Sequence, residues 1–306
     1  MMRLKHRILL QEARQFFKSS QYEQAIQRYE EIYEFGLIRE DMLDLGSSYI
    51  EIKKFHQAEE LFKSILTHDK DARSCYSLAF IYEEEGRYDE ALNYYEEAIE
   101  LEPDHFFLYY DCAFLYDYLQ RYAEAKEYYQ KALAIDPNHF WGNINLGAIF
   151  EQEGNDQVAL ALFLKAYEAD SKQSMVAYNL GVVYSKLQEN DKALLYYLEE
   201  LTKSNPYPQT YYNLGILYKS AFKDYEKAKQ AYLKGLELNP EQYELWYNLG
   251  CLYVVMNDYL NATECFTYVY YKKRSLFKYI EEDSELSSYL KSPEYQLIIQ
   301  EKALSK

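Results

Sequence analysis

The sequence predicts an all-α fold, a solenoid of about eight helix-turn-helix repeats followed by a C-terminal capping helix. Two observations predict it. The 306 residues include only 10 glycines and 6 prolines and are 49% hydrophobic, a composition that favours helices over long loops. Small and aromatic residues also recur with a period near 34 residues, and repeats of that length stack around one continuous core.

The period is clearest between Pro103 and Pro137, which close two similar runs of sequence, and it extends in both directions as columns of equivalent positions. One column is always alanine: Ala25, Ala58, Ala91, Ala125, Ala159, Ala193, Ala228 and Ala262. A second is always aromatic: Tyr29, Phe62, Tyr95, Tyr129, Phe163, Tyr197, Tyr232 and Phe266. A third is always small: Ala13, Gly46, Ala79, Ala113, Gly147, Gly181, Gly215 and Gly250. We expect the small columns to let helices approach closely, and the aromatic residues to fill the space between neighbouring pairs.

Each repeat is predicted to be two helices joined by a short polar turn, as in residues 140–154 and 155–170. One repeat carries an extra residue between Ser220 and Asp224, which we place in the turn between its helices. The predicted repeats are 6–38, 39–71, 72–105, 106–139, 140–173, 174–207, 208–242 and 243–276.

The tail, residues 277–306, departs from the period. Ser292 and Pro293 are typical of a helix start, since serine caps helices and proline fits their first turn. We interpret the tail as a cap over the last repeat; its alternative is a helix for dimerisation or docking.

These columns, and above all the segments AYNLGVVYSKLQENDKALLYYLEEL and LWYNLGCLYVVMNDYLNATECF, resemble the tetratricopeptide repeat family. The resemblance covers residues 6–276 and implies a right-handed superhelix in which the first helix of each repeat lines a concave groove. It is specific for the fold and leaves the partner open. The lysines fall at other positions than the carboxylate clamp of the chaperone-binding members requires, so that partner is not carried over.

The groove positions that the resemblance implies combine aromatic, asparagine and lysine residues. The aromatic candidates are Tyr76, Phe80, Phe107, Tyr110, Phe114, Tyr118, Trp141, Tyr178, Tyr212 and Tyr247. The asparagines are Asn145, Asn179, Asn213 and Asn248, and the lysines are Lys186 and Lys219. An amide side chain both donates and accepts, so the asparagine column is suited to a peptide backbone, unless asparagine is only the family's usual residue there. The acids Glu83, Glu84, Asp117 and Glu151 accompany the aromatic residues.

Charge and motifs narrow the classes of function. A net charge of −17 repels nucleic acid and anionic membrane surfaces, and it suits either solubility or a basic partner. Four cysteines without a CxxC pair predict free buried thiols, and no zinc spacing occurs. The N-terminal apolar run is too short for a signal peptide and no run is long enough for a membrane span, which predicts a cytoplasmic protein. No phosphate-binding, nucleophile or metalloprotease motif occurs, so we expect no cofactor and no metal.

These observations favour a protein-interaction scaffold that binds an extended peptide segment in its groove. Two alternatives stay open at this stage. The array is a sensor whose pitch changes when a peptide or small ligand binds, or it is an enzyme whose site is built from scattered residues. The sequence does not fix the oligomeric state, and we favour a monomer.

Overall fold

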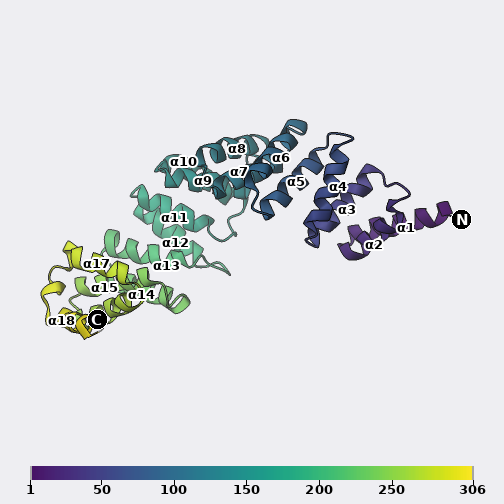
Figure 1. Ribbon diagram of the computed structural model, residues 1–306. Coiled ribbons are helices and arrows are strands. Elements are labelled where there is room, and N and C mark those ends of the chain that lie inside the picture. The colour runs from purple at the N-terminus through teal and green to yellow at the C-terminus, as the bar shows by residue number, and fades with distance from the viewer. Residues whose placement is uncertain (1, 305–306) are drawn as a thin grey trace. The chain divides into compact units, whose positions relative to one another are not determined.

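The computed structural model describes residues 2–304, and the structure of this part of the chain consists of helices without a strand (Figure 1). The chain divides into two compact units, Met1–Ile149 and Phe150–Lys306, which are described separately. The predicted all-α fold of consecutive helix pairs is confirmed.

The helices of the first unit follow one another as antiparallel neighbours joined by short turns. They are α1 (Met2–Lys18), α2 (Tyr22–Tyr33), α3 (Arg39–Glu51), α4 (Phe55–Leu66), α5 (Ala72–Glu84), α6 (Tyr88–Leu101), α7 (Phe106–Tyr118), α8 (Tyr122–Ile135) and α9 (Phe140–Gln152), whose last residues belong to the second unit.

The second unit continues the same alternation and ends in the tail. Its helices are α10 (Asp156–Ala169), α11 (Val176–Lys186), α12 (Asn190–Glu200), α13 (Gln209–Leu217), α14 (Tyr225–Leu238), α15 (Tyr243–Val255), α16 (Tyr259–Lys272), α17 (Arg274–Glu282) and α18 (Pro293–Leu304). A π-turn, Tyr218–Phe222, extends α13, and two short 3-10 turns, Ser284–Leu286 and Tyr289–Lys291, precede α18.

The turn between the helices of a pair requires one residue with positive φ. Gly86 (φ 74°) and Gly154 (φ 78°) adopt it without strain, because glycine has no Cβ. Ser20, Lys53 and Gln120 take the same conformation in other pairs, with φ between 56° and 59°. The fold therefore imposes this turn even where the residue does not favour it.

The small and aromatic columns pack against each other inside a pair, which refines the expectation that the rings fill the space between neighbouring pairs. A Cβ atom added to Gly181 would lie 2.5 Å from the ring of Tyr197, and one added to Gly250 would lie 2.6 Å from Phe266. The first helix thus lacks a side chain where the ring of the second helix lies. The ring, rather than direct backbone contact, fills the interface of the pair.

The extra residue of the seventh repeat was expected in the turn between its helices. The structure absorbs it at the end of the first helix, where Lys223 N donates to Tyr218 O across the π-turn. Bonding over five residues instead of four accommodates one residue without moving the core.

The tail packs on the last helix pair. Tyr289 is fully buried among aromatic residues that include Phe266 and Tyr259, and its hydroxyl lies 2.8 Å from Thr263 Oγ1. Tyr295 N donates to Ser292 Oγ at 3.2 Å, the cap expected of that serine. Residues 305 and 306 of the predicted tail lie outside the described residues.

Candidate functional site

The predicted groove residues lie on the first helices of their pairs in both units. In the first unit they form the α5–α7–α9 face, to which the structure adds one acid, Asp111: Tyr76, Phe80, Glu83, Phe107, Tyr110, Asp111, Phe114, Asp117, Tyr118, Trp141 and Asn145. In the second unit they form the α11–α13–α15 face: Tyr178, Asn179, Lys186, Tyr212, Asn213, Lys219, Tyr247 and Asn248.

Exposure separates the aromatic candidates into two groups. Tyr118 is 66% exposed, Phe107 52%, Phe114 49% and Trp141 44%, and all four project from α7 or α9. The other aromatic candidates are half-buried: Tyr76, Phe80, Tyr110, Tyr178, Tyr212 and Tyr247. The four exposed rings are therefore the candidates for contact with a ligand.

The half-buried tyrosines bind the first helix of the next pair or, for Tyr247, the residue that follows α17, through what we term tyrosine rungs. Each rung joins a phenol to an Asn or Asp residue 35 or 36 positions later, at distances between the polar atoms of 2.7 to 3.4 Å. The pairs are Tyr76–Asp111, Tyr110–Asn145, Tyr178–Asn213, Tyr212–Asn248 and Tyr247–Asp283. In the three asparagine rungs the amide nitrogen is the donor.

The rungs assign the asparagine column a structural role that the sequence analysis did not foresee. Asn145 Nδ2 donates to both Tyr110 and Tyr129, each at 3.2 Å, so its two amide protons are used inside the protein. Only the Oδ1 atom of such an asparagine is left to meet a ligand.

Asn179 differs from the other asparagines of its column. The residue 35 positions before it is Ile144, which has no hydroxyl group. Within residues 2–304 the side chain of Asn179 forms no hydrogen bond, and it is half-buried on α11. Its amide is thus available as both donor and acceptor.

Three acids of the α5–α7–α9 face are partly buried without a Lys or Arg partner among the described residues: Glu83, Asp111 and Asp117. Burial raises the pKa of each carboxyl group, although Tyr95 donates to Glu83 at 2.9 Å and Tyr76 to Asp111 at 2.7 Å. Asp111 was not among the predicted groove residues, although it occupies the column of the asparagines, 34 residues before Asn145.

The two predicted lysines are neutralised by acids of their own unit. Lys186 Nζ forms ion pairs with Glu151 and, at 3.9 Å, with Asp156. Lys219 Nζ lies 3.4 Å from Glu285 of the tail. A ligand on the α11–α13–α15 face would have to displace these partners to reach either ammonium group.

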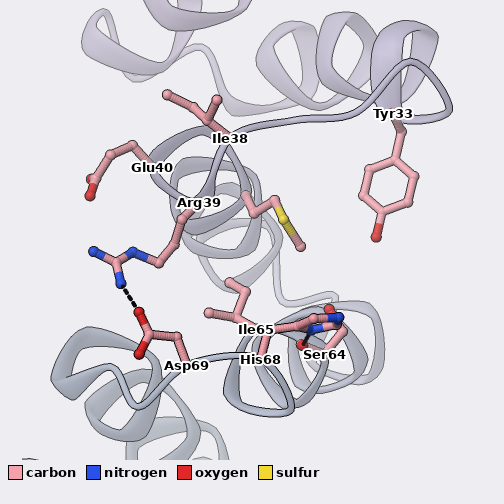
Figure 2. A pocket seen from close by; sticks show the side chains of 9 residues that line it. Tyr33, Ile38, Arg39, Glu40, Ser64, Ile65, His68 and Asp69 are labelled. Carbon is pink, nitrogen blue, oxygen red and sulfur yellow. Dashed lines mark hydrogen bonds and ion pairs between the residues drawn. The ribbon is translucent and has the colours of Figure 1, made fainter.

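Two of the pockets in the first unit bear on the predicted groove or differ from it. One, of about 760 Å³, is lined by the last residue of α2, by Ile38 and the start of α3, and by the end of α4 with the residues after it: Tyr33, Ile38, Arg39, Glu40, Met42, Ser64, Ile65, His68 and Asp69 (Figure 2). Arg39 pairs with Asp69 at 2.7 Å on one side of it, and Tyr33 stands apart on the other (Figure 2). It contains none of the predicted groove residues. The second pocket, of about 390 Å³, does include Tyr76 and Phe107.

The thiols and acids offer little to catalysis or metal binding. Burial raises the pKa of Cys75, Cys251 and Cys265 to about 12, and raises that of Cys112 as well, so these thiols stay protonated. In the described part of the chain, no three His, Cys, Asp or Glu side chains gather as metal ligands would. None of the helices described combines the length and the apolar character that crossing a bilayer demands.

Five sequence profiles described as tetratricopeptide repeat match the chain, at residues 71–138, 113–174, 176–206, 208–242 and 231–264. No curated protein matches it.

Among solved structures, the chain is similar to PilF of Pseudomonas aeruginosa, with 21% identity, a TM-score of 0.57, and coverage of 68% of this chain and 94% of that one. It is similar to the C-terminal part of a TPR repeat-containing protein from Cytophaga hutchinsonii, with 17% identity, a TM-score of 0.63, and coverage of 78% and 98%. YrrB, described as a TPR protein with an unusual peptide-binding site, has 20% identity, a TM-score of 0.50, and coverage of 62% and 98%. At these identities the likeness concerns the fold.

Proposed function

Because the chain belongs to the tetratricopeptide repeat family, we propose that it is a protein-interaction scaffold that binds an extended segment of a partner protein on its first-helix faces. The observation that carries the proposal is the group of four exposed rings on α7 and α9: Phe107, Phe114, Tyr118 and Trp141. Large rings exposed together are typical of interaction surfaces, where their burial supplies most of the affinity.

The α5–α7–α9 face is the principal binding surface in this proposal. Tyr110 stacks on Phe114 with the ring centroids 6.5 Å apart, and Tyr110 is itself fixed by its rung to Asn145. The exposed ring of Phe114 therefore rests on a rigid support. A ligand that covers it loses little side-chain entropy on the protein's side, which favours affinity.

The α11–α13–α15 face has a secondary role in the proposal. The free amide of Asn179 and the Oδ1 atoms of the rung asparagines would bind the backbone of the peptide. YrrB, whose structure is described as having an unusual peptide-binding site, provides a precedent for peptide binding by this fold and no more.

The test is selection of peptides on the full-length protein. A phage-displayed library of 12-residue peptides is selected on the wild type, and the enriched peptides are synthesised with a fluorophore. Their dissociation constants are measured by fluorescence anisotropy for wild type, Phe114→Ala, Trp141→Ala and the control Ile135→Ala. Ile135 is 39% exposed on α8, a second helix of the same unit.

Each groove variant is expected to bind roughly thirty times more weakly, since truncating a central aromatic residue costs about 2 kcal/mol in binding hot spots. The Ile135→Ala variant is expected to bind as the wild type does. If no peptide is enriched, or if all four proteins bind equally, the proposal fails.

A further inference from the structure

We propose that the α5–α7–α9 face selects a partner segment that presents a lysine or arginine side chain beside an apolar residue, with the cation bound between the acids and rings of α7. This inference rests on the proposed function and names the chemistry of the partner. It goes beyond the family assignment, which leaves the partner open.

Four rings and one acid, Asp117, share one stripe of α7. Phe107, Tyr110, Phe114, Asp117 and Tyr118 follow one another at spacings of three, four, three and one residues, which places them along one side of the helix.

Asp111, next to Tyr110 on α7, faces α5 through its hydrogen bond with Tyr76. The negative charges of both Asp111 and Asp117 act on the phenol of Tyr110 and raise its pKa, although burial is the larger cause, so both carboxylates lie near that ring. A cation beside Tyr110 and Phe114 would contact π faces and carboxylates together, the two partners that ammonium and guanidinium groups prefer.

The surrounding segment supplies no cation of its own to these acids. Residues 74–120 contain twelve Asp and Glu residues and a single Lys or Arg residue, Arg87, which pairs with Glu90 at 2.6 Å. At the edges of the segment, Arg73 pairs with Asp44 at 3.0 Å and Arg121 with Glu124 at 2.8 Å.

His139, the histidine near Asp111 that packs on Tyr110, does not replace the missing cation. His105 and His139 lie close enough for their positive forms to stabilise the ionised carboxyl group of Asp111. Burial, however, lowers the pKa of His139, so that ring is neutral at neutral pH, and it packs 5.2 Å from the ring of Tyr110. The face therefore keeps its negative charge.

Comparison of the rungs shows that the charge of Asp111 is not needed for the fold. Asn145, Asn213 and Asn248 hold the same rung position as neutral amides and bond the same phenol group. Asp111 makes its rung as a carboxylate instead, and its burial penalises the charge. Because the fold accepts a neutral residue at this position, a ligand of opposite charge explains why Asp111 is charged.

The occupant is a basic segment of another protein rather than nucleic acid or a second copy of this chain. The protein has a net charge of −17, so its own surface and a phosphate backbone are both repelled by this face. A positively charged segment is attracted over distances of about 8 Å at physiological salt, which accelerates encounter, and the exposed rings then hold its apolar neighbour.

The test compares matched peptides on matched variants. A peptide enriched on the wild type is synthesised with its lysine or arginine and with norleucine in its place, and both are titrated by fluorescence anisotropy. The proteins are wild type, Asp111→Asn, Asn145→Asp and the control Glu100→Gln. Glu100 is an exposed acid on α6, so its loss changes the net charge by the same amount as the loss of Asp111.

We expect Asp111→Asn to weaken the basic peptide at least tenfold and the norleucine peptide less than twofold. Asn145→Asp, which adds a charge at the next rung, should strengthen the basic peptide alone. Glu100→Gln should change neither peptide by more than twofold. Unchanged melting temperatures of the variants check that the rungs are intact.

Failure of this inference is distinct from failure of the proposed function. If Phe114→Ala weakens the enriched peptides but norleucine replaces their basic residue without loss, or if they carry no basic residue, the face binds peptides and does not select a cation. If Phe114→Ala and Trp141→Ala change nothing, the binding surface itself is wrong and both proposals fall.

Discussion

The two first-helix faces share one architecture and differ in how their charges are satisfied. On the α11–α13–α15 face, Lys186 pairs with Glu151 and Lys219 with Glu285, and two of its three rungs end in neutral asparagines. On the α5–α7–α9 face, Asp111 and Asp117 have no Lys or Arg partner among the residues described. The repeat thus supplies equivalent positions on both faces. Charged residues at these positions are paired within the protein on the α11–α13–α15 face, whereas those on the α5–α7–α9 face require a partner.

The largest expected effect is on the framework that both faces share. Ala193 is fully buried in α12, where the structure leaves no room for a carboxylate or its solvation. Ala193→Asp should cost about 4 kcal/mol or more, because it buries an unpaired charge between packed helices. Urea unfolding measures it, with the exposed neighbour Leu195→Asp, 61% exposed on the same helix, as the control. Equal stability of the two variants would mean that the helix register is wrong.

The second effect tests a buried ion pair for which the α5–α7–α9 face has no counterpart. Glu200 is fully buried and accepts hydrogen bonds from Met175 N and Tyr207 N, both at 3.0 Å, so it fixes two loops at once. Lys203 Nζ lies 2.8 Å from its other oxygen. Glu200→Gln should cost about 3 kcal/mol, since it leaves a nearly buried ammonium group without its counter-charge.

The pH dependence of Glu200 follows from the direction of its pKa. Burial favours the neutral acid, but the hydrogen bonds from Lys203 and from the two backbone amides outweigh it and lower the pKa. The stabilisation is therefore complete above the unfolded pKa of about 4.3 and is lost as the pH falls through the lowered folded value. In acid titrations followed by circular dichroism, the Glu200→Gln variant should show a weaker loss of stability below about pH 4. Parallel acid curves for wild type and variant would contradict the assignment.

The third effect distinguishes Asn213, whose amide is used in a tyrosine rung, from Asn179, whose amide forms no hydrogen bond within the described residues. Asn213→Leu removes the donor to Tyr178 and should cost about 1 kcal/mol of stability, the usual net value of a hydrogen bond. Asn179→Leu removes no hydrogen bond, so its cost should stay below about 0.5 kcal/mol. Thermal unfolding of the pair decides: if both variants lose the same stability, the rungs are not what separates the two residues.

The sequence was sufficient to predict the fold because the repeat is a local rule applied many times. The small column at Gly181 predicted a close approach of helices, and the aromatic column at Tyr197 was expected between neighbouring pairs. The structure instead places the ring of Tyr197 inside the pair, where the glycine lacks its Cβ. The π-turn after α13 could not be predicted, because an insertion can be absorbed either in a turn or in a helix end at similar cost.

The site was less predictable, since its hydrogen bonds join residues of two different columns in successive repeats. The sequence marked Asn145 as a groove residue, but its pairing with Tyr110 joins positions 35 residues apart in different repeats. Asp111 was missed because the column was defined by asparagine. A comparison of the column at Tyr76 and Tyr110 with the column at Asp111 and Asn145 would have indicated both the rung and its charged exception.

The smallest expected effect concerns the loss of stability that the buried charge of Asp111 causes. Burial raises the pKa of Asp111 above its usual value of about 3.9, so ionisation at neutral pH destabilises the folded protein relative to the unfolded chain. Asp111→Asn keeps a partner for Tyr76 and removes this penalty. The variant should therefore be as stable as the wild type near pH 3 and more stable at pH 7, by less than about 1 kcal/mol. Tyr76, Glu83, His105 and His139 face Asp111 in both proteins, and the difference includes the effect of the Asp111 charge on Glu83 and His139. Urea unfolding of both proteins from pH 3 to pH 7 measures that difference.

A wild type that gains stability over the variant as the pH rises would show that the carboxylate is already satisfied inside the protein, and the contrast between the two faces would disappear.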